Sequence, residues 1–198
     1  MLGPKPPGKR SVNLSIWKKL RQLFRSTGKD HDFISIVILL PQARDLPEDV
    51  LRAAAERAWK CKFEGTEENP NFIMQKIRHS IVWAEGHFMT VANSANPYRD
   101  NTVKQAEKMR DLRWRKAWLE QRAFTSIDYI QGVPSAISLQ DKYAVLAKLA
   151  AELLTDEYTG ICLPGENEII PAHADLANQL RNFSTLEKLM AESSEVVH

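Results

Sequence analysis

Apolar and polar residues follow a helical period at the start of the chain, in the segment VNLSIWKKLRQLFRS (12–26). At about 100° per residue, the apolar side chains fall on one arc and the basic side chains fill the other side. The apolar arc consists of Val12, Ile16, Trp17, Leu20, Leu23 and Phe24. The pattern therefore predicts an amphipathic helix, with a flexible Pro/Gly/Lys-rich tail (1–11) before it and a break (26–32) after it.

The run FISIVILLP (33–41) is apolar on both faces of an extended chain. Such a run is typical of a central strand rather than an edge strand. After it, Asp45 and Glu48 have the spacing of a capping box, and Pro47 suits a first helical turn. An apolar stripe then continues at helical spacing, so we expect a helix that ends near residue 62.

The segment FIMQKIRHSIVWAEGHFMTVANS (72–94) predicts two strands, 72–84 and 87–92, joined by a turn at Glu85 and Gly86. The apolar positions of the first strand are Ile73, Ile77, Ile81 and Trp83. Further along, the pattern predicts one long helix from about Thr102 to Leu119 and a strand over 122–132.

The order of these elements predicts the fold class. A β-α-β-β-α-β order over residues 33–132 is that of a ferredoxin-like α/β sandwich. The remaining chain predicts a helix that begins at Ser138, a hairpin over 160–171 and one or two final helices within 172–192. We therefore expect an α+β fold: a ferredoxin-like sandwich with an α-β-β-α C-terminal extension. Residues 1–31 would form a basic arm, and residues 32–198 a single domain.

The stretch that begins RAFTSIDYIQG and continues LQDKYAVLAKLAAELLTDEYTGICLPGENEIIPA (122–172) resembles a known family. It has a strand, an amphipathic helix and a short apolar strand that leads into two apolar residues and a proline. This arrangement is similar to the bacterial family of domain of unknown function 4261. The resemblance implies an α+β fold. It implies no activity or catalytic residues, because the family has none assigned.

Composition and charge narrow the class of protein. Apolar residues make up 43% and charged residues 26% of the 198 residues, which are ordinary globular values. The net charge of +2 is unevenly distributed: residues 1–33 hold eight Lys and Arg against Asp30 and Asp32, a net +6. The rest of the chain therefore carries −4. A basic arm on a mildly acidic body is typical of contact with polyanions or membranes.

The common catalytic and cofactor motifs do not occur. The glycines match neither the phosphate-binding loop nor the dinucleotide fingerprint, and there is no G-x-S-x-G elbow. Two cysteines are too few for a disulfide scaffold or a cysteine zinc site. We expect no cofactor. The chain also has no run of about 18 apolar residues and no signal-peptide core, so we expect a cytoplasmic location, with peripheral membrane contact as an option.

Two polar groups are candidates for chemistry. His79, Glu85 and His87 lie around a predicted hairpin and have side chains that bind metals. With the turn at residues 85 and 86, however, the two histidines fall several residues apart, which favours two separate strand histidines. Asp128, on the last predicted strand, could act as a general base if a pocket raised its pKa. No partner carboxylate stands at an informative spacing, which favours a structural function for Asp128.

The segment RDLRWRKAWLEQR (110–122) interleaves basic and aromatic residues, as nucleic-acid-binding surfaces do. Its tryptophans share a side with Val103, Ala106 and Ala117, so packing on a sheet is the favoured interpretation. Arg110 and Arg113 lie near that side and could clamp an anion. Nucleic acid is not an expected partner.

The arm has three interpretations: packing on its own or a sister domain, docking on a partner protein, and lying on an anionic membrane. The candidate contact residues of the arm are Trp17, Lys18, Lys19, Arg21, Phe24 and Arg25. The sequence favours a non-catalytic intracellular binding or accessory domain, which docks on a larger partner through this arm or associates with itself. The alternative is an unrecognised metal-dependent or hydrolytic enzyme with a site near His79, Glu85, His87 and Asp128.

Overall fold

A computed structural model describes residues 34–99, 102–130, 137–155, 157–165 and 168–182. All of these residues belong to one compact unit. The predicted arm lies outside the described residues, so its helix and the boundary at residue 31 stay predictions.

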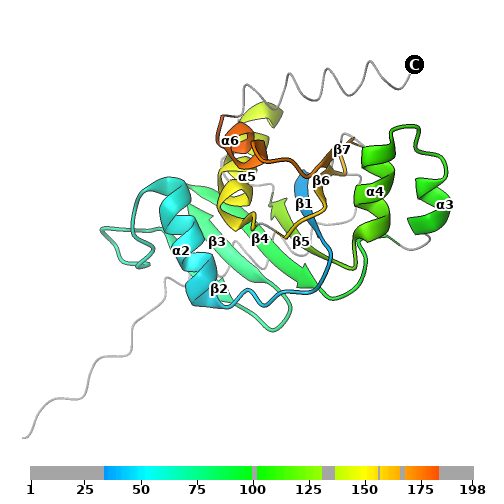
Figure 1. Ribbon diagram of the computed structural model, residues 1–198. Helices are drawn as coiled ribbons and strands as arrows, with labels where there is room; N and C mark the ends of the chain where they lie inside the picture. The colour runs from blue at the N-terminus through cyan, green and yellow to red at the C-terminus, as the bar shows by residue number, and fades with distance from the viewer. Residues whose placement is uncertain (1–33, 100–101, 131–136, 156, 166–167, 183–198) are drawn as a thin grey trace, which may run out of the picture. The chain divides into compact units, whose positions relative to one another are not determined.

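Seven strands and five helices make up the described part of the chain (Figure 1). In chain order they are β1 (Ser35–Leu40), α2 (Glu48–Trp59), β2 (Phe72–Gln75), β3 (Ser80–Ala84), β4 (His87–Ser94), α3 (Thr102–Ala106), α4 (Leu112–Glu120), β5 (Ala123–Tyr129), α5 (Leu139–Leu153), β6 (Gly160–Leu163), β7 (Glu168–Pro171) and α6 (Leu176–Arg181).

The strands form one sheet in the order β2-β3-β4-β5-β1-β6-β7. Every pair of neighbouring strands is antiparallel. β1 lies inside the sheet, between β5 and β6, which confirms the prediction of a central strand. The α+β class is confirmed as well.

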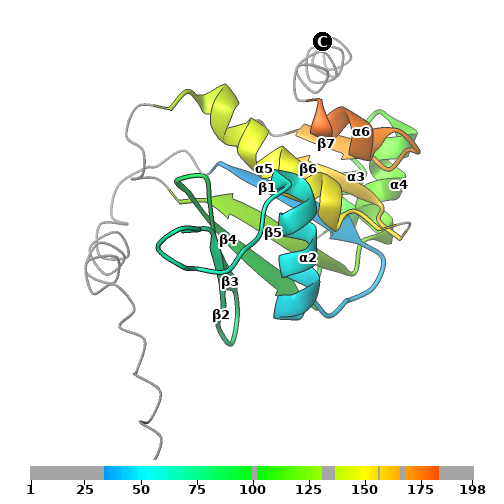
Figure 2. The ribbon, with the colours of Figure 1, turned by 90° about the vertical axis from the view of Figure 1, so that its left-hand side faces the viewer.

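Helices cover the sheet on both sides, and β1 shows why its sequence is apolar throughout. Its Ile36, Ile38 and Leu40 belong to the larger core, which they form with buried residues of α2, α5 and α6. Val37 and Leu39 point the other way, into a smaller core with Ala106 of α3 and Trp118 of α4. Figures 1 and 2 show α3 and α4 beside the β6–β7 end of the sheet, away from β2 and β3.

The ferredoxin-like topology is not confirmed. In that sandwich each helix joins two parallel strands that are separated by a third strand. Here β4 and β5, which α3 and α4 connect, are antiparallel neighbours. β5 therefore occupies the place between β4 and β1, and β1 pairs with β6 from the C-terminal extension. The extension itself has the predicted order α5-β6-β7-α6, but its strands complete the main sheet.

The predicted strand 72–84 is interrupted by a turn. β2 ends at Gln75, β3 begins at Ser80, and the Lys76 N–H donates to the His79 carbonyl at 2.8 Å. Ile77, one of the apolar positions of the predicted strand, is fully exposed at the turn. The polar neighbours Lys76, Arg78 and His79 explain why the strand is interrupted. A turn gives their side chains contact with solvent, which a buried strand would not.

The predicted helix 102–119 is also broken, into α3 and α4. Asp111 begins a new helix, since its side chain accepts hydrogen bonds from the N–H groups of Arg113 and Trp114. This N-cap satisfies donors that a continuous helix would pair internally. Ala117 and Trp118 are buried as predicted, whereas Val103 is 60% exposed.

The capping box predicted at Asp45 and Glu48 is not formed. α2 begins after Pro47, whose carbonyl accepts the first helical hydrogen bond from the Leu51 N–H at 3.1 Å. No side chain caps this end of the helix. Ser138 is a true N-cap of α5, as predicted, because its Oγ accepts from the Asp141 N–H at 3.1 Å.

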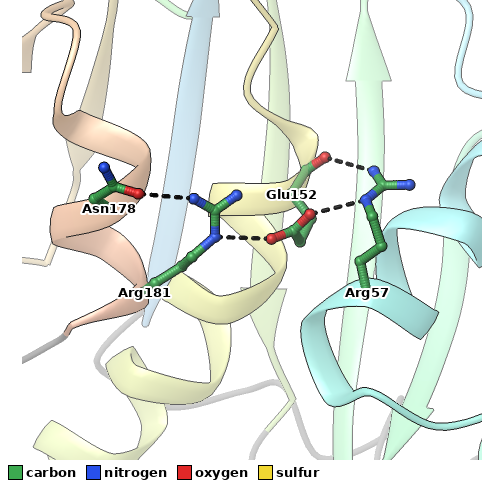
Figure 3. A network of polar contacts seen from close by, with 4 residues as sticks. All are labelled: Arg57, Glu152, Asn178 and Arg181. Atoms are coloured by element: carbon green, nitrogen blue, oxygen red, sulfur yellow. Dashed lines mark hydrogen bonds and ion pairs between the residues drawn. The ribbon is translucent and has the colours of Figure 1, made fainter.

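Glu152 of α5 ties three helices together (Figure 3). It accepts from Arg57 Nε of α2 and from Arg181 Nε of α6, each at 2.9 Å. Arg181 also donates to the Asn178 side chain at 3.0 Å. Burial alone would raise the pKa of Glu152, but the hydrogen bonds and charges of the two arginines outweigh it, and the pKa is lowered.

Replacing Glu152 with Gln is expected to lower the free energy of unfolding at pH 7 by about 1 kcal/mol, because hydrogen bonds to a charged group are lost while both arginines stay largely solvated. The lowered pKa means that this contribution is present above the unfolded-state pKa of about 4.3 and is lost as pH falls through the folded-state value. Urea unfolding at pH 7 and pH 3 should therefore show the two proteins converging in acid.

The matched control is Glu120→Gln, because Glu120 is exposed and lies 3.9 Å from Lys116. It should stay within about 0.5 kcal/mol of the wild type. Equal losses for the two substitutions, or no convergence at low pH, would contradict this function of Glu152.

Candidate functional site

An open cleft of about 630 Å³ lies at one end of the sheet. Three segments form it: the loop that leads into α2, the turn between β2 and β3, and part of β4. Its lining residues are Arg44, Asp45, Leu46, Pro47, Gln75, Lys76, Ile77, Arg78, His79, Ser80, Val91 and Asn93.

Arg44 fixes the first wall of the cleft to the body of the protein. Its Nη1 donates to the Leu153 carbonyl at 2.6 Å, at the C-terminal end of α5. A cation suits this position, because the last carbonyls of a helix carry partial negative charge. Its Nη2 also lies 3.4 Å from the Thr125 hydroxyl.

Asn93 joins the Arg44 loop to β4 and β5. Thr125 Oγ1 donates to Asn93 Oδ1 at 2.6 Å, and Asn93 Nδ2 donates to the Arg44 carbonyl at 3.3 Å. Burial lowers the pKa of the Arg44 guanidinium, but an arginine keeps its charge at any physiological pH. The buried Arg44 Nε has no hydrogen-bond partner in the described part of the chain. The wall therefore holds a positive charge that is only partly compensated.

The second wall is the turn at residues 76–79. Gln75 Nε2 lies 3.4 Å from the Leu46 carbonyl, so the two walls are in contact. Beyond this contact Arg78 is exposed, and His79 is half-buried. The turn joins the short strands β2 and β3, and its basic side chains, Lys76 and Arg78, are exposed where they line the cleft.

The charge of the cleft is positive. Among its lining residues, Arg44, Lys76 and Arg78 are cationic, and Asp45 is the one acidic residue. Leu46, Pro47, Ile77 and Val91 supply apolar surface between these groups. Cations beside apolar surface can hold an acidic group and pack against the aliphatic side chains next to it.

His79, Glu85 and His87, the predicted metal candidates, are not brought together. His79 lies before β3, and Glu85 and His87 lie after it. Within the described residues, no three His, Cys, Asp or Glu side chains are grouped so that they could hold a metal ion. Only His79 lines the cleft.

His87 and Glu85 have partners near α5. His87 Nδ1 lies 3.0 Å from the Tyr129 hydroxyl, and Glu85 Oε2 lies 3.8 Å from Lys148 Nζ. Burial lowers the pKa of His87, against the effect of the nearby Glu85 carboxylate. The lowered pKa favours the neutral imidazole, which is a hydrogen-bonding partner of Tyr129.

Asp128 lies on the other face of the sheet. It pairs with Thr90 of β4, and His87 is three residues away on that strand, so the Asp128 and His87 side chains project on opposite faces. Ser35 Oγ donates to Asp128 Oδ1 at 2.5 Å, and Ser126 Oγ donates to Oδ2 at 3.1 Å. Burial raises the pKa of Asp128, although these hydrogen bonds act in the opposite direction.

The two predicted anion-binding arginines of 110–122 differ in their contacts. Arg113 Nη2 forms an ion pair at 3.0 Å with Asp111, the N-cap of α4, so the charge of Arg113 is paired. Arg110 is exposed in the break between α3 and α4. The other predicted contact residues, Trp17, Lys18, Lys19, Arg21, Phe24 and Arg25, lie outside the described residues.

Three cationic residues of the cleft were not predicted from the sequence: Arg44, Lys76 and Arg78. The available signal was the group KIRH (76–79), which places three polar residues inside an otherwise apolar run. Such a group marks a turn more often than a buried strand. Arg44 carried no local signal, because its partner Leu153 is 109 residues away.

Comparison with protein families, curated proteins and solved structures finds no match to this chain. The resemblance to domain of unknown function 4261 stays a prediction. Among the helices of the described ranges, none has the length and apolar character needed to cross a membrane.

Proposed function

We propose that the chain is a non-catalytic intracellular binding domain that docks on a larger protein partner, and that the cleft holds an acidic segment of that partner. The observation that carries the proposal is the lining of the cleft: three cations against one acid, set among apolar side chains. The predicted basic arm is a second contact, because residues 1–33 carry a net +6.

The chemistry of the lining favours a protein segment over nucleic acid. Single-stranded nucleic acid is held by basic grooves with aromatic side chains that stack on bases. The cleft has no Phe, Tyr or Trp among its lining residues, and its apolar surface is aliphatic. Ile77, fully exposed at the rim, provides an apolar contact of the kind that protein interfaces bury.

The alternative is an enzyme whose site combines His79, Glu85, His87 and Asp128. It has less support, because these residues lie at opposite ends of β3 and on opposite faces of the sheet. Elemental analysis of the untagged protein tests the metal-dependent form of this alternative, and absence of a metal would leave only metal-free hydrolytic chemistry. A stoichiometric transition metal would favour the enzyme and count against a purely binding function.

Reversing the cleft charge is expected to weaken the binding of an acidic peptide about tenfold, or about 1.4 kcal/mol. The variant is Lys76→Glu with Arg78→Glu, and the probe is a ten-residue polyglutamate peptide titrated into the full chain by calorimetry. The loss follows because two attractive charges become repulsive while Arg44 is unchanged. Raising the salt concentration should reduce the difference.

The control is Lys104→Glu with Lys108→Glu, which makes the same change in net charge on the α3–α4 side. It should change peptide affinity less than twofold. An arm variant, Lys18→Glu with Lys19→Glu, measures the second contact separately. Unchanged affinity in the cleft variant would contradict the proposal, and so would equal losses in the cleft and control variants.

A further inference from the structure

Exposed apolar side chains are concentrated on α3 and α4. Six large apolar side chains are exposed within the described residues, and three of them belong to these two short helices. They are Val103, 60% exposed, Leu112, 72% exposed, and Leu119, 37% exposed. The others, Val50, Ile77 and Leu139, lie on three separate elements.

The leucines of α4 form a stripe on its outer side. Leu112 and Leu119 are seven residues apart, and Lys116 lies between them at the spacing that places it on the same side. The opposite side of α4 carries the buried residues Ala117 and Trp118, which face the sheet. The exposed leucines are therefore not the edge of the core, and α4 is apolar on two sides.

Exposed cations precede these leucines in the α3–α4 segment. Lys104, Lys108 and Arg110 are exposed, and none of them forms an ion pair within the described part of the chain. Arg113 and Lys116 are exposed too, but they are paired with Asp111 and Glu120. The α3–α4 segment thus combines exposed apolar side chains with three exposed cations that have no ion pair in the described part of the chain, and Glu107 is the exposed acid among them.

We propose that this surface contacts an anionic membrane. The α3–α4 surface consists of Val103, Lys104, Lys108, Arg110, Leu112 and Leu119. Leucines flanked by lysine and arginine are the composition of helices that lie in the membrane interface. The leucines enter the headgroup region, and the cations remain at the level of the lipid phosphates and carboxylates.

Charge complementarity selects the membrane as the occupant. Each uncompensated cation near an anionic lipid surface is expected to raise the partition coefficient roughly fivefold. The surface lies on α3 and α4, which are beside the β6–β7 end of the sheet (Figures 1 and 2), whereas the cleft is lined by residues of the β2–β3 turn, the loop before α2 and β4. Contact with a membrane therefore leaves the cleft accessible to a partner.

The test is flotation of the full chain with vesicles of phosphatidylcholine alone and with 30% phosphatidylserine. The wild type should float only with the anionic vesicles, and high salt should release it. Leu112→Ser with Leu119→Ser is expected to lower the partition coefficient roughly tenfold. Lys104→Glu with Lys108→Glu should lower it by more than roughly 25-fold, because two attractive charges are lost and two repulsive charges are added.

The matched control is Val50→Ser with Leu139→Ser, because these side chains are 47% and 49% exposed outside the α3–α4 surface. Its partition coefficient should stay within twofold of the wild type, as should that of the cleft variant Lys76→Glu with Arg78→Glu. Urea unfolding of each variant checks that it is folded.

Two results would overturn the proposal. Undiminished flotation of folded α3–α4 variants would place the membrane contact elsewhere on the chain. Equal losses of partition coefficient in the α3–α4, control and cleft variants would show that membrane binding depends only on total charge and exposed apolar area. Either result leaves the peptide measurement at the cleft unaffected, so the two proposals fail independently.

Discussion

Gly160→Ala is expected to lower the free energy of unfolding by about 1–3 kcal/mol. Gly160 begins β6 and pairs with Pro171 of β7. A Cβ at this position would lie 2.7 Å from the Ile170 carbonyl oxygen and 3.3 Å from Pro171 Cα. Both atoms belong to the backbone, so the hairpin must separate to admit the methyl group. Urea unfolding measures the loss.

A loss of stability on Gly160→Ala is the opposite of what Gly→Ala does at an unstrained position. At an unstrained position, replacing Gly with Ala stabilises a protein by about 0.4–1 kcal/mol, because the unfolded chain loses freedom. A gain in stability would show that the close approach of β6 and β7 is wrong. Adding Ala117→Gly should not rescue the variant, since Ala117 Cβ would lie at an ordinary 3.5 Å from the new methyl group.

Arg44→Met is expected to destabilise the fold by about 2 kcal/mol, because it removes a charged donor from the C-terminal carbonyls of α5. Methionine keeps much of the apolar stem but cannot donate to the Leu153 carbonyl. Arg44→Lys should lose about half as much, since it keeps the charge and loses the second donor, which reaches Thr125. Thermal and urea unfolding measure these effects.

The control for Arg44 is Arg78→Met, on the opposite wall of the cleft. Arg78 is exposed, so its substitution should change the free energy of unfolding by less than about 0.5 kcal/mol. Equal losses at Arg44 and Arg78 would contradict the account in which Arg44 anchors the cleft and Arg78 only lines it.

Some elements were predicted correctly because a few neighbouring residues determine them. β1 was recognised because both its faces are apolar, and both faces are in fact covered by helices. The N-cap of α5 at Ser138 and the β6–β7 hairpin were also predicted from short-range signals. These features depend on a few neighbouring residues, which a sequence displays directly.

The errors arose where a weak local signal interrupted a strong pattern. Ile77 continued the apolar period of a strand, but its polar neighbours formed a turn. Val103 and Trp118 fall on one side of the single helix predicted over 102–119. Asp111 instead caps a new helix, so α3 and α4 are separate. In both cases, hydrogen bonding or solvation of polar groups decided the local structure against the one that the apolar spacing predicted.

Strand order and the candidate site depend on distant pairings, which local patterns do not encode. β4 has β5 rather than β1 as its neighbour, a pairing between strands that the α3–α4 segment separates in the chain. Arg44 acquires its position from Leu153, Thr125 and Asn93, all far away in the chain. A cleft formed by such contacts becomes visible only when the sheet is assembled.

The most direct test of the proposed binding function is amide chemical-shift mapping of the isotope-labelled full chain during titration with the polyglutamate peptide. We expect the largest shifts at residues 44–46 and 75–80, with a separate set in residues 1–33. Loss of the first set in Lys76→Glu with Arg78→Glu would assign it to the cleft. Shifts confined to residues 1–33, with none at the cleft, would contradict the account.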